Sequence, residues 1–374
     1  MTDSVAAADA KVLQPTAAPD QALAPVNGPT PPIGPRLAAP ELRQKTISSF
    51  VPQLPDEATK TEGEKAVSPQ KEEPAIGPAV NWANTENYLV LGTDRLPGQV
   101  VWRTDSIMMV GLDREKGRAT VLSIPRDLWV QIPNYGWGRI NQVDYLGEQR
   151  QPGNGPFFVS QVLSQTLGIS AQHWVRVQMD GFQAMIDAVG GVTIHLDCPF
   201  YELSYSGASF ALPAGDIHLD GATAYRYVRL RLRESDIGRA SRQRQVLWAL
   251  RNQAMQANLI TRLPELWSAF QGAFSTDLGL LDLLSLARFG MSLDKSQVRA
   301  GGITLNDLQS FVTAQGADVL RIANPNRVRA VVDGVWEAPE MDNSRKQTTA
   351  KCPALPPGVK VTQVATDTVK AGGQ

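Results

Sequence analysis

Three short apolar runs follow one another within about 40 residues, and each is bounded by polar or turn-forming residues. The first is "YLVL" at 88–91, followed by "GTD"; the second is "DSIMMVGLD" at 105–113; the third is "ATVLSI" at 119–124. The turn "REKG" separates the last two runs. Apolar runs of this length indicate buried strands, so the chain is expected to build a sheet around these three segments.

Helical patterns come next along the chain. "PFFVSQVLSQTLGI" (156–169) and "DGFQAMIDAVGG" (180–191) have helical spacing, and the glycine pair that closes the second is typical of a helix C-terminus. "VTIHL" (192–196) then indicates a further strand. Strands that alternate with helices predict an α/β layer fold with one central sheet in a single domain.

Both ends of the chain have a different composition from this periodic middle. Residues 1–82 and 339–374 are poor in residues that a core can bury, and the first segment is rich in Pro, Ala, Glu and Lys. Such segments cannot offset the entropy lost on ordering, so both are predicted to be disordered, with one domain at 83–338 between them. The sequence shows no apolar run of membrane-spanning length and no signal peptide.

The cysteines and histidines offer little. Cys198 and Cys352 are too few for a disulfide framework and lack metal-ligand spacing, so they leave the redox compartment open. The three histidines share no motif and are interpreted as structural or surface residues. Neither a G-x-S-x-G elbow nor a P-loop lysine motif occurs, which leaves nucleophilic catalysis and Walker-type nucleotide binding without support.

One stretch, "RYVRLRLRESDIGRASRQRQ" at 226–245, concentrates arginine in a chain whose net charge is −1. Arg229 and Arg231 alternate with aliphatic residues, which predicts a strand with its guanidinium groups on one face. After Gly238 the spacing becomes helical, and it places Arg239 and Gln243 on the stripe that faces the core. A strand face and a helix N-terminus would then form one pocket for an anion, most simply a phosphate.

The alternative to an anion pocket is a solvated basic face. Four arginines of the stretch are interpreted as solvated or structural residues and not as ligands of an anion: Arg226, Arg233, Arg242 and Arg244. Nucleic acid is not an expected partner. Acidic residues interrupt the stretch, and no series of aromatic residues that could stack on bases lies beside it.

Acidic residues stand where the predicted strands end. Asp94 follows the first strand, and Asp105 opens the second with Arg103 two residues before it. Two carboxylates at one edge of a sheet suit Mg²⁺, which completes its octahedron with water and phosphate oxygens. The competing interpretation is that each aspartate only forms a turn or a cap.

A third polar site follows the third strand. Arg126 and Asp127 come directly after Pro125, which ends the strand and presents the arginine on a loop. An internal Arg–Asp ion pair is the alternative to a ligand-binding arginine at this place.

Seven segments in this order resemble the LytR-CpsA-Psr family, also named for a cell-envelope-related transcriptional attenuator domain. The ordered match runs from about 85 to about 260. The segments are "LVLGTD", "RTDSIMMV", "LSIPRDLWVQIP", "RINQVDYLG", "MDGFQAMIDAVGGVTIHL", "FALPAGDIHLDGATAYRYVR" and "DIGRASRQRQVL".

The resemblance implies a three-layer α/β/α sandwich with a central mixed sheet and an apolar lipid-binding pocket, to which "FFVSQVL" and "FQAMIDAV" would contribute lining. It implies a phosphotransferase that moves a glycopolymer from a polyprenyl-pyrophosphate carrier to the peptidoglycan of the cell wall, leaving a phosphodiester link. The residues that match the family's functional positions are Asp94 and Asp105 for Mg²⁺; Arg103, Arg126, Arg229, Arg231, Arg239 and Gln243 for the pyrophosphate; and Arg103, Asp105 and Arg126 for catalysis.

Arginines and metal would neutralise charge on the phosphates, so the protein itself contributes little covalent chemistry. Asp127 or Asp236 is the expected general base, if one is needed. The resemblance places the protein in the extracytoplasmic cell envelope, at the membrane surface through its lipid substrate. Two other functions remain open: a non-catalytic regulator that binds polyprenyl phosphate, and a polyprenyl-pyrophosphate hydrolase.

Overall fold

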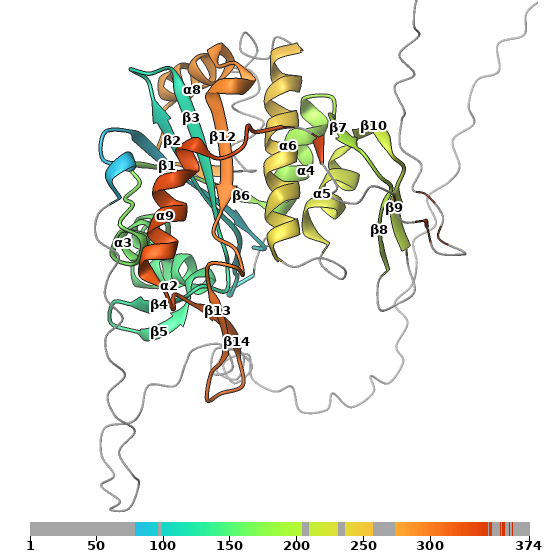
Figure 1. The fold of residues 1–374 in the computed structure, drawn as a ribbon. Coiled ribbons are helices and arrows are strands. Elements are labelled where there is room, and N and C mark those ends of the chain that lie inside the picture. The colour runs from blue at the N-terminus through green and yellow to red at the C-terminus, as the bar shows by residue number, and fades with distance from the viewer. Residues whose placement is uncertain are drawn as a thin grey trace, which may run out of the picture. The chain divides into compact units, whose positions relative to one another are not determined.

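The computed structural model describes residues 79–95, 99–203, 209–230, 236–256 and 274–342, together with positions 344, 345, 352, 354, 355, 359 and 361. A six-stranded mixed sheet lies at the centre of the described residues, in the order β11-β6-β1-β2-β3-β12 (Figure 1). Its strands are β1 (Glu86–Thr93), β2 (Thr104–Asp113), β3 (Arg118–Ile124), β6 (His173–Gln178), β11 (Phe274–Thr276) and β12 (Val298–Gly302).

The three apolar runs of the sequence form the middle of this sheet, as predicted. β1 and β2 pair antiparallel, and so do β2 and β3. Next to them β6 runs parallel to β1 and β12 runs parallel to β3. Side chains alternate between the two faces, so Met109 packs in one core while its neighbour Met108 packs in another.

Helices cover both faces of the sheet, which confirms the predicted three-layer α/β/α arrangement (Figure 1). α2, α3 and α9 share one core with the sheet, and α6 and α8 share the other. None of the described helices is both long and apolar enough to cross a membrane. The helices are α2 (Val143–Arg150), α3 (Gly155–Leu167), α4 (Met179–Ala188), α5 (Gly221–Arg229), α6 (Asp236–Gln256), α8 (Leu280–Ser292) and α9 (Pro325–Gly334).

A third core forms beside α6, where α4 and α5 pack with smaller sheets. The predicted strand at 192–196 is present as β7, but it belongs to the small sheet β10-β7-β15 and not to the central one. The remaining strands are β4 (Trp129–Ile132), β5 (Gly136–Arg139), β7 (Val192–Leu196), β8 (Phe200–Leu203), β9 (Ser209–Leu212), β10 (Gly215–Leu219), β13 (Gln309–Val312), β14 (Asp318–Arg321) and β15 (Ser344–Arg345).

The prediction that the alternating arginines form a strand is wrong for the residues that the structure describes. Residues up to Arg229 belong to helix α5, which Asp220 caps by accepting a 2.8 Å hydrogen bond from the Thr223 backbone. Ala224 and Tyr227 are fully buried on the inner face of α5. The spacing of three between these two buried residues is helical. The alternation of arginine and aliphatic residues in the sequence therefore extends across the end of a helix. Arg231 lies outside the described residues.

A buried ionic network joins the segment before β2 to helix α2 and strand β6. Asp144 is fully buried and accepts hydrogen bonds from the Trp102 indole at 2.9 Å and from Arg176 at 2.7 Å. Arg176 also reaches Glu148 at 2.6 Å. Burial raises the pKa of the Asp144 carboxyl above its ordinary value, against the opposing effect of Arg176.

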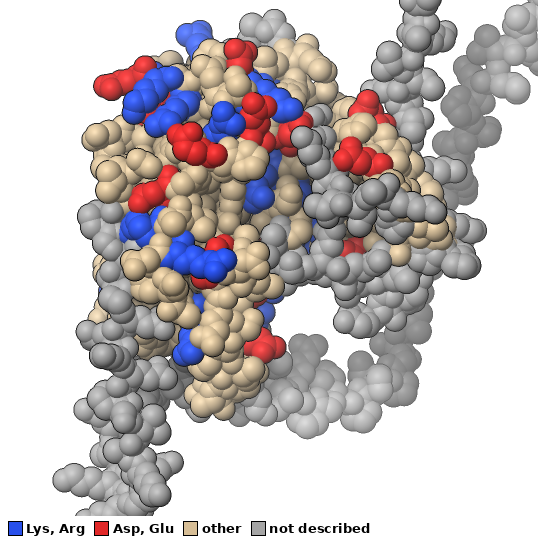
Figure 2. Space-filling model, viewed as in Figure 1, with Lys and Arg blue, Asp and Glu red and all other residues tan. Residues whose placement is uncertain are grey.

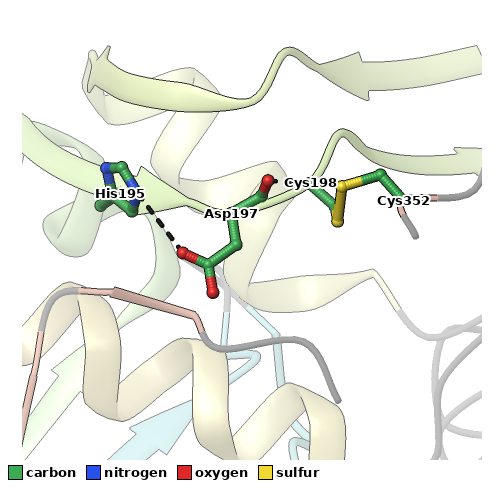
Figure 3. Close-up of a disulfide and its surroundings, with 4 residues drawn as sticks. All are labelled: His195, Asp197, Cys198 and Cys352. Carbon is green, nitrogen blue, oxygen red and sulfur yellow. Dashed lines mark hydrogen bonds and ion pairs between the residues drawn. A yellow bond between two sulfur atoms is a disulfide. The ribbon is translucent and has the colours of Figure 1, made fainter. Parts of the chain in front are cut away.

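A few positions of the C-terminal segment are described by the structure, whereas the disorder expected for 339–374 stays a prediction. Met341 is buried against the α8 side of the sheet, and Ser344–Arg345 pair with β7 as strand β15. Cys352 forms a disulfide with Cys198, which follows β7, across a sequence separation of 154 residues (Figure 3). The Cys352 sulfur also lies 3.4 Å from the carbonyl oxygen of Asp197. A buried side chain, backbone pairing and one covalent bond therefore hold these positions against the rest of the fold.

Reducing the disulfide is expected to lower the free energy of unfolding by about 2–4 kcal/mol, because the cross-link restricts the unfolded chain over a long loop. Urea unfolding with and without a phosphine reductant measures the change. The double variant Cys198→Ser, Cys352→Ser serves as the control and should be insensitive to reductant. Identical urea midpoints for the oxidised and reduced wild-type protein would contradict the prediction.

Candidate functional site

Asp94 and Asp105 lie where β1 ends and β2 begins. The backbone N–H of Arg103 donates to Asp94 Oδ1 at 2.6 Å, and the Asp94 N–H donates back to the Arg103 carbonyl at 3.0 Å. Thr93 pairs with Thr104, but Gly92 pairs with Ser106, so Asp105 has no partner in β1 and forms a β-bulge. A bulge of this kind redirects a side chain and is common beside active sites.

Arg126 reaches Asp105 from the end of the neighbouring strand β3. Its guanidinium forms a hydrogen-bonded ion pair with Asp105 Oδ1, and both side chains are largely buried. Nε of Arg126 lies 3.4 Å from Asp127, which in turn lies 3.5 Å from Nε of Arg139. Arg126 is thus held between two carboxylates, and Asp127 serves here as an ion-pair partner.

Helix α6 supplies the third side of the site, as its helical spacing predicts. Arg239 is 4% exposed, and its Nη2 donates to the Asp105 carbonyl at 3.1 Å. One turn later, Gln243 Oε1 accepts a 2.9 Å hydrogen bond from the Ser106 hydroxyl. Arg239 and Gln243 therefore face the start of β2 from the first two turns of the helix.

The structure brings six predicted residues together: Asp94, Arg103, Asp105, Arg126, Arg239 and Gln243. We call them the Asp105 cluster. Arg229 is exposed in the last turn of α5, where it donates to the Tyr225 hydroxyl and stacks on that ring. Arg231 and the side chain of Asp236 lie outside the described residues. The roles proposed for Arg229 and Arg231 stay predictions.

An apolar cavity of about 130 Å³ opens beside the Asp105 cluster. We call it the α4–α6 cavity. Gly92, Ser106 and Gln243 form its polar end, so it shares Gln243 with the cluster. The other lining residues are Val90, Leu91, Met108, Val177, Gln178, Phe182, Met185, Val228, Val246, Leu247 and Leu250.

The predicted lining is half correct. Phe182 and Met185, from the "FQAMIDAV" segment on α4, line the α4–α6 cavity. The "FFVSQVL" segment does not: Phe158 and Val162 of α3 pack in the core on the opposite face of the sheet. Helical periodicity shows that a helix has an apolar face, but it does not say which side of a sheet that face covers.

The carboxylates of the cluster fit a magnesium ion as donors. Asp94 and Asp105 stand at adjoining strand ends, where Arg103 and Arg126 hold one oxygen of each carboxylate in place. Mg²⁺ binds through one or two carboxylates and fills its remaining positions with water and phosphate oxygens. Within the described part of the chain no three His, Cys, Asp or Glu residues gather, so an all-protein cage is not formed there.

The sequence left Arg242 and Arg244 of α6 as solvated or structural residues; in the structure Arg242 is buried and Arg244 is half-buried. Arg242 is fully buried; it donates to the carbonyls of Tyr227 and Leu230 and so ties the end of α5 to α6. Arg244 donates to the Ser123 hydroxyl at 2.7 Å, and burial lowers the pKa of its guanidinium to about 10. Helical spacing extended past Gln243 was the available signal, because it turns successive arginines of α6 toward different neighbours.

The positive charge of the site is local. On the face shown in Figure 2, basic and acidic side chains lie interspersed, and the described residues of that face form no continuous basic surface. Arginines of the 226–245 stretch such as Arg239 and Arg242 are buried. The arrangement suits a small anionic group held between a sheet edge and a helix.

The sequence matches the model of the LytR_cpsA_psr family over residues 51–327. The polyisoprenyl-teichoic acid–peptidoglycan teichoic acid transferase TagU of Oceanobacillus iheyensis is 32% identical over 234 residues, which cover 61% of this chain and 71% of TagU. The probable cell wall biosynthesis protein LcpB of Corynebacterium glutamicum is 34% identical, covering 46% of this chain and 43% of LcpB. The regulatory protein MsrR of Staphylococcus aureus is 31% identical, covering 51% and 56%.

Solved structures share the fold. TagT bound to LIIa-WTA superposes with a TM-score of 0.52 at 22% identity, covering 75% of this chain and 98% of TagT. YwtF (TagT) with bound octaprenyl pyrophosphate lipid superposes with a TM-score of 0.50 at 21% identity, covering 75% and 98%. At this level of identity the likeness supports a common architecture.

Proposed function

Because the chain belongs to the LytR_cpsA_psr family, we propose that it is a phosphotransferase that attaches a glycopolymer from a polyprenyl-pyrophosphate carrier to peptidoglycan. One observation carries the proposal: the Asp105 cluster stands at the polar end of the α4–α6 cavity and shares Gln243 with it. An apolar cavity that ends in arginines and carboxylates matches a ligand with a lipid chain and a pyrophosphate head.

In the proposed reaction the acceptor hydroxyl oxygen bonds to the phosphorus that carries the glycopolymer. The bond from that phosphorus to the bridging oxygen breaks, and polyprenyl monophosphate leaves with the electron pair. The hydroxyl proton passes to solvent or to the leaving phosphate. Arg126 and Arg239 would face the phosphates with charge already in place, so little reorganisation is needed when negative charge grows on the leaving group.

Mg²⁺ is part of the proposal, with Asp94 and Asp105 as its protein ligands. When bound, the ion would withdraw charge from the phosphate oxygens. The contribution of the chain is to hold the two carboxylates. Arg103 fixes Asp94 through two backbone hydrogen bonds, and Arg126 fixes Asp105 through its guanidinium. Such fixed ligands favour one geometry over others.

The cell envelope, outside the cytoplasm, is the proposed location, with the membrane surface reached through the lipid substrate. The name of TagU, a polyisoprenyl-teichoic acid–peptidoglycan transferase, supports this for a relative. The disulfide between Cys198 and Cys352 is the kind of bond that persists in oxidising compartments.

Turnover tests the proposal. The purified protein is incubated with Mg²⁺, peptidoglycan and a polyprenyl-pyrophosphate-linked oligosaccharide labelled in its sugar. We expect label in muropeptides after muramidase digestion, one polyprenyl monophosphate released per transfer, and loss of both on addition of EDTA. A control without peptidoglycan should release no lipid monophosphate.

Two other outcomes would replace the proposal. Lipid monophosphate released without an acceptor indicates a hydrolase. Lipid that binds without any turnover indicates a regulator. The relative MsrR is named a regulatory protein, so this alternative is tested as well. Mass spectrometry of lipid that co-purifies with the protein identifies the ligand in either case.

A further inference from the structure

A second cavity, separate from the α4–α6 cavity, lies between β3, β12 and α6, and Arg244 forms part of its wall. We call it the β3–α6 cavity; it holds about 50 Å³. Nη1 of Arg244 donates to the Ser123 hydroxyl, and no carboxylate of the described residues pairs with this guanidinium. None of the six residues of the Asp105 cluster lines this cavity.

The Arg244 side chain is half-buried, and its guanidinium forms one hydrogen bond with the described residues. Arginine stays protonated in proteins and carries five donors, so the contact with Ser123 leaves donors of Arg244 that a ligand in the cavity can use. The Nε and Nη2 side of the guanidinium has the fork geometry that binds a carboxylate bidentately. Ser123 accepts from Arg244 and keeps its own hydroxyl proton available as a further donor.

Gly302 leaves room next to this pair. A Cβ placed there would lie 3.1 Å from the Ser123 Cβ and 3.4 Å from Nη1 of Arg244. The space beside the guanidinium is therefore kept open by the absence of a side chain on β12. The rest of the wall is mainly aliphatic, and Leu305 forms an exposed part of it, at 46% exposure.

The two cavities flank α6 and adjoin the Asp105 cluster from different sides. Gln243 lines the α4–α6 cavity, and the next residue, Arg244, lines the β3–α6 cavity. Three chain neighbours join the cluster to the cavities. Ser106 follows Asp105 and lines the first cavity, whereas Pro125 precedes Arg126 and Ala240 follows Arg239, both lining the second. A ligand in the β3–α6 cavity would thus approach the reacting phosphates from the side away from the lipid.

Resting on the proposed transferase function, we propose that the β3–α6 cavity is the acceptor subsite and that Arg244, with Ser123, binds a carboxylate of the glycan acceptor. A single half-buried cation in a small, mainly aliphatic cavity matches one negative charge. The doubly charged pyrophosphate finds several arginines in the Asp105 cluster instead. A phosphodiester of the donor glycopolymer carries the same single charge, so the experiment separates these two sources.

Binding is measured by saturation-transfer NMR titration with N-acetylmuramoyl-L-alanyl-D-glutamate (the acid), which has stem-peptide carboxylates, and with its uncharged diamide (the amide) as probes. We expect the wild-type protein to prefer the acid. In Arg244→Gln the affinity for the acid should fall roughly tenfold or more, as the loss of charge-assisted hydrogen bonds implies, while the amide is unaffected. Arg288→Gln, which removes an exposed arginine on α8, is the control for net charge and should leave the preference intact.

A second pair of variants guards against a folding defect in Arg244→Gln. Leu305→Glu introduces a carboxylate at the exposed wall of the cavity, where it competes with the ligand for Arg244. Leu305→Gln has nearly the same shape without the charge, so the difference between the two variants isolates electrostatics. We expect Leu305→Glu to bind the acid several times more weakly than Leu305→Gln does. Equal affinity of acid and amide for the wild type, or of the acid for both Leu305 variants, overturns the proposal.

Steady-state transfer then assigns the site to one substrate. In Arg244→Gln we expect a rise of roughly tenfold or more in KM for the acceptor, with KM for the carrier-linked donor unchanged. A rise confined to the donor assigns the cavity to a donor phosphodiester and contradicts the acceptor subsite. If wild-type protein transfers nothing while its preference for the acid persists, the transferase function fails and the carboxylate site stands.

Discussion

The Arg126→Ala protein is expected to transfer glycopolymer roughly 100- to 1,000-fold more slowly than the wild type, with most of the loss in kcat. Arg126 is the guanidinium that extends from β3 to Asp105, and in the proposed mechanism it faces the phosphate that receives negative charge. A preorganised donor aimed at developing charge contributes this much to a rate, because water replaces it only with reorganisation. Initial rates with labelled carrier-linked oligosaccharide give the measurement.

The matched control comes from the same two strands. Arg118 stands at the opposite end of β3 and pairs with Asp113 of β2 at 3.2 Å, so Arg118→Ala removes an ion pair between the same two strands, far from the Asp105 cluster. We expect this variant to retain nearly full activity. Thermal unfolding of both variants separates a catalytic defect from a folding defect. A folded Arg126→Ala protein with wild-type kcat would remove Arg126 from the mechanism.

Replacement of Arg176 by methionine is expected to lower the free energy of unfolding by about 3–5 kcal/mol, the largest effect on stability that we predict. Arg176 compensates the charge of Asp144, which is fully buried, and removing one partner leaves an isolated charge in the core. Urea unfolding followed by circular dichroism measures the loss. Because Trp102 binds the same carboxylate and precedes Arg103, we also expect weaker activity at temperatures where the fold persists.

Two comparisons show whether the buried charge is the cause. Adding Asp144→Asn to Arg176→Met removes the charge but keeps an acceptor for the Trp102 indole, so the double variant should recover part of the lost stability. The second comparison is the exposed ion pair of Arg114 and Glu86, 2.8 Å apart, which should contribute at most about 1 kcal/mol to the free energy of unfolding. A double variant less stable than Arg176→Met alone would contradict this account.

Short-range patterns in the sequence were enough to predict the central strands and the helix that carries Arg239. Runs such as "YLVL" and "ATVLSI" are apolar throughout because helices cover both faces of the sheet. The spacing of Arg239 and Gln243 is helical, and both side chains face the start of β2. In these cases the local pattern and the tertiary environment agree, so the pattern alone identifies the element.

The same reasoning failed where a pattern crossed an element boundary. The alternation around Arg229 spans the end of α5, and the cap at Asp220 with the buried Tyr227 decides for a helix. Pairings between distant segments were also beyond reach. Nothing in the local sequence shows that α3 packs on the face away from the α4–α6 cavity, or that Arg244 lies against Ser123 of β3.

The disulfide also has a use as a biological indicator. Cys198 and Cys352 are bonded to each other, and the described residues include no other cysteine. Thiols in the cytosol are kept reduced, whereas the bond forms and persists outside it. Alkylation of freshly broken cells labels the chains with free thiols and leaves the disulfide-bonded chains unlabelled. The ratio of the two therefore measures how much of the protein folded on each side of the membrane.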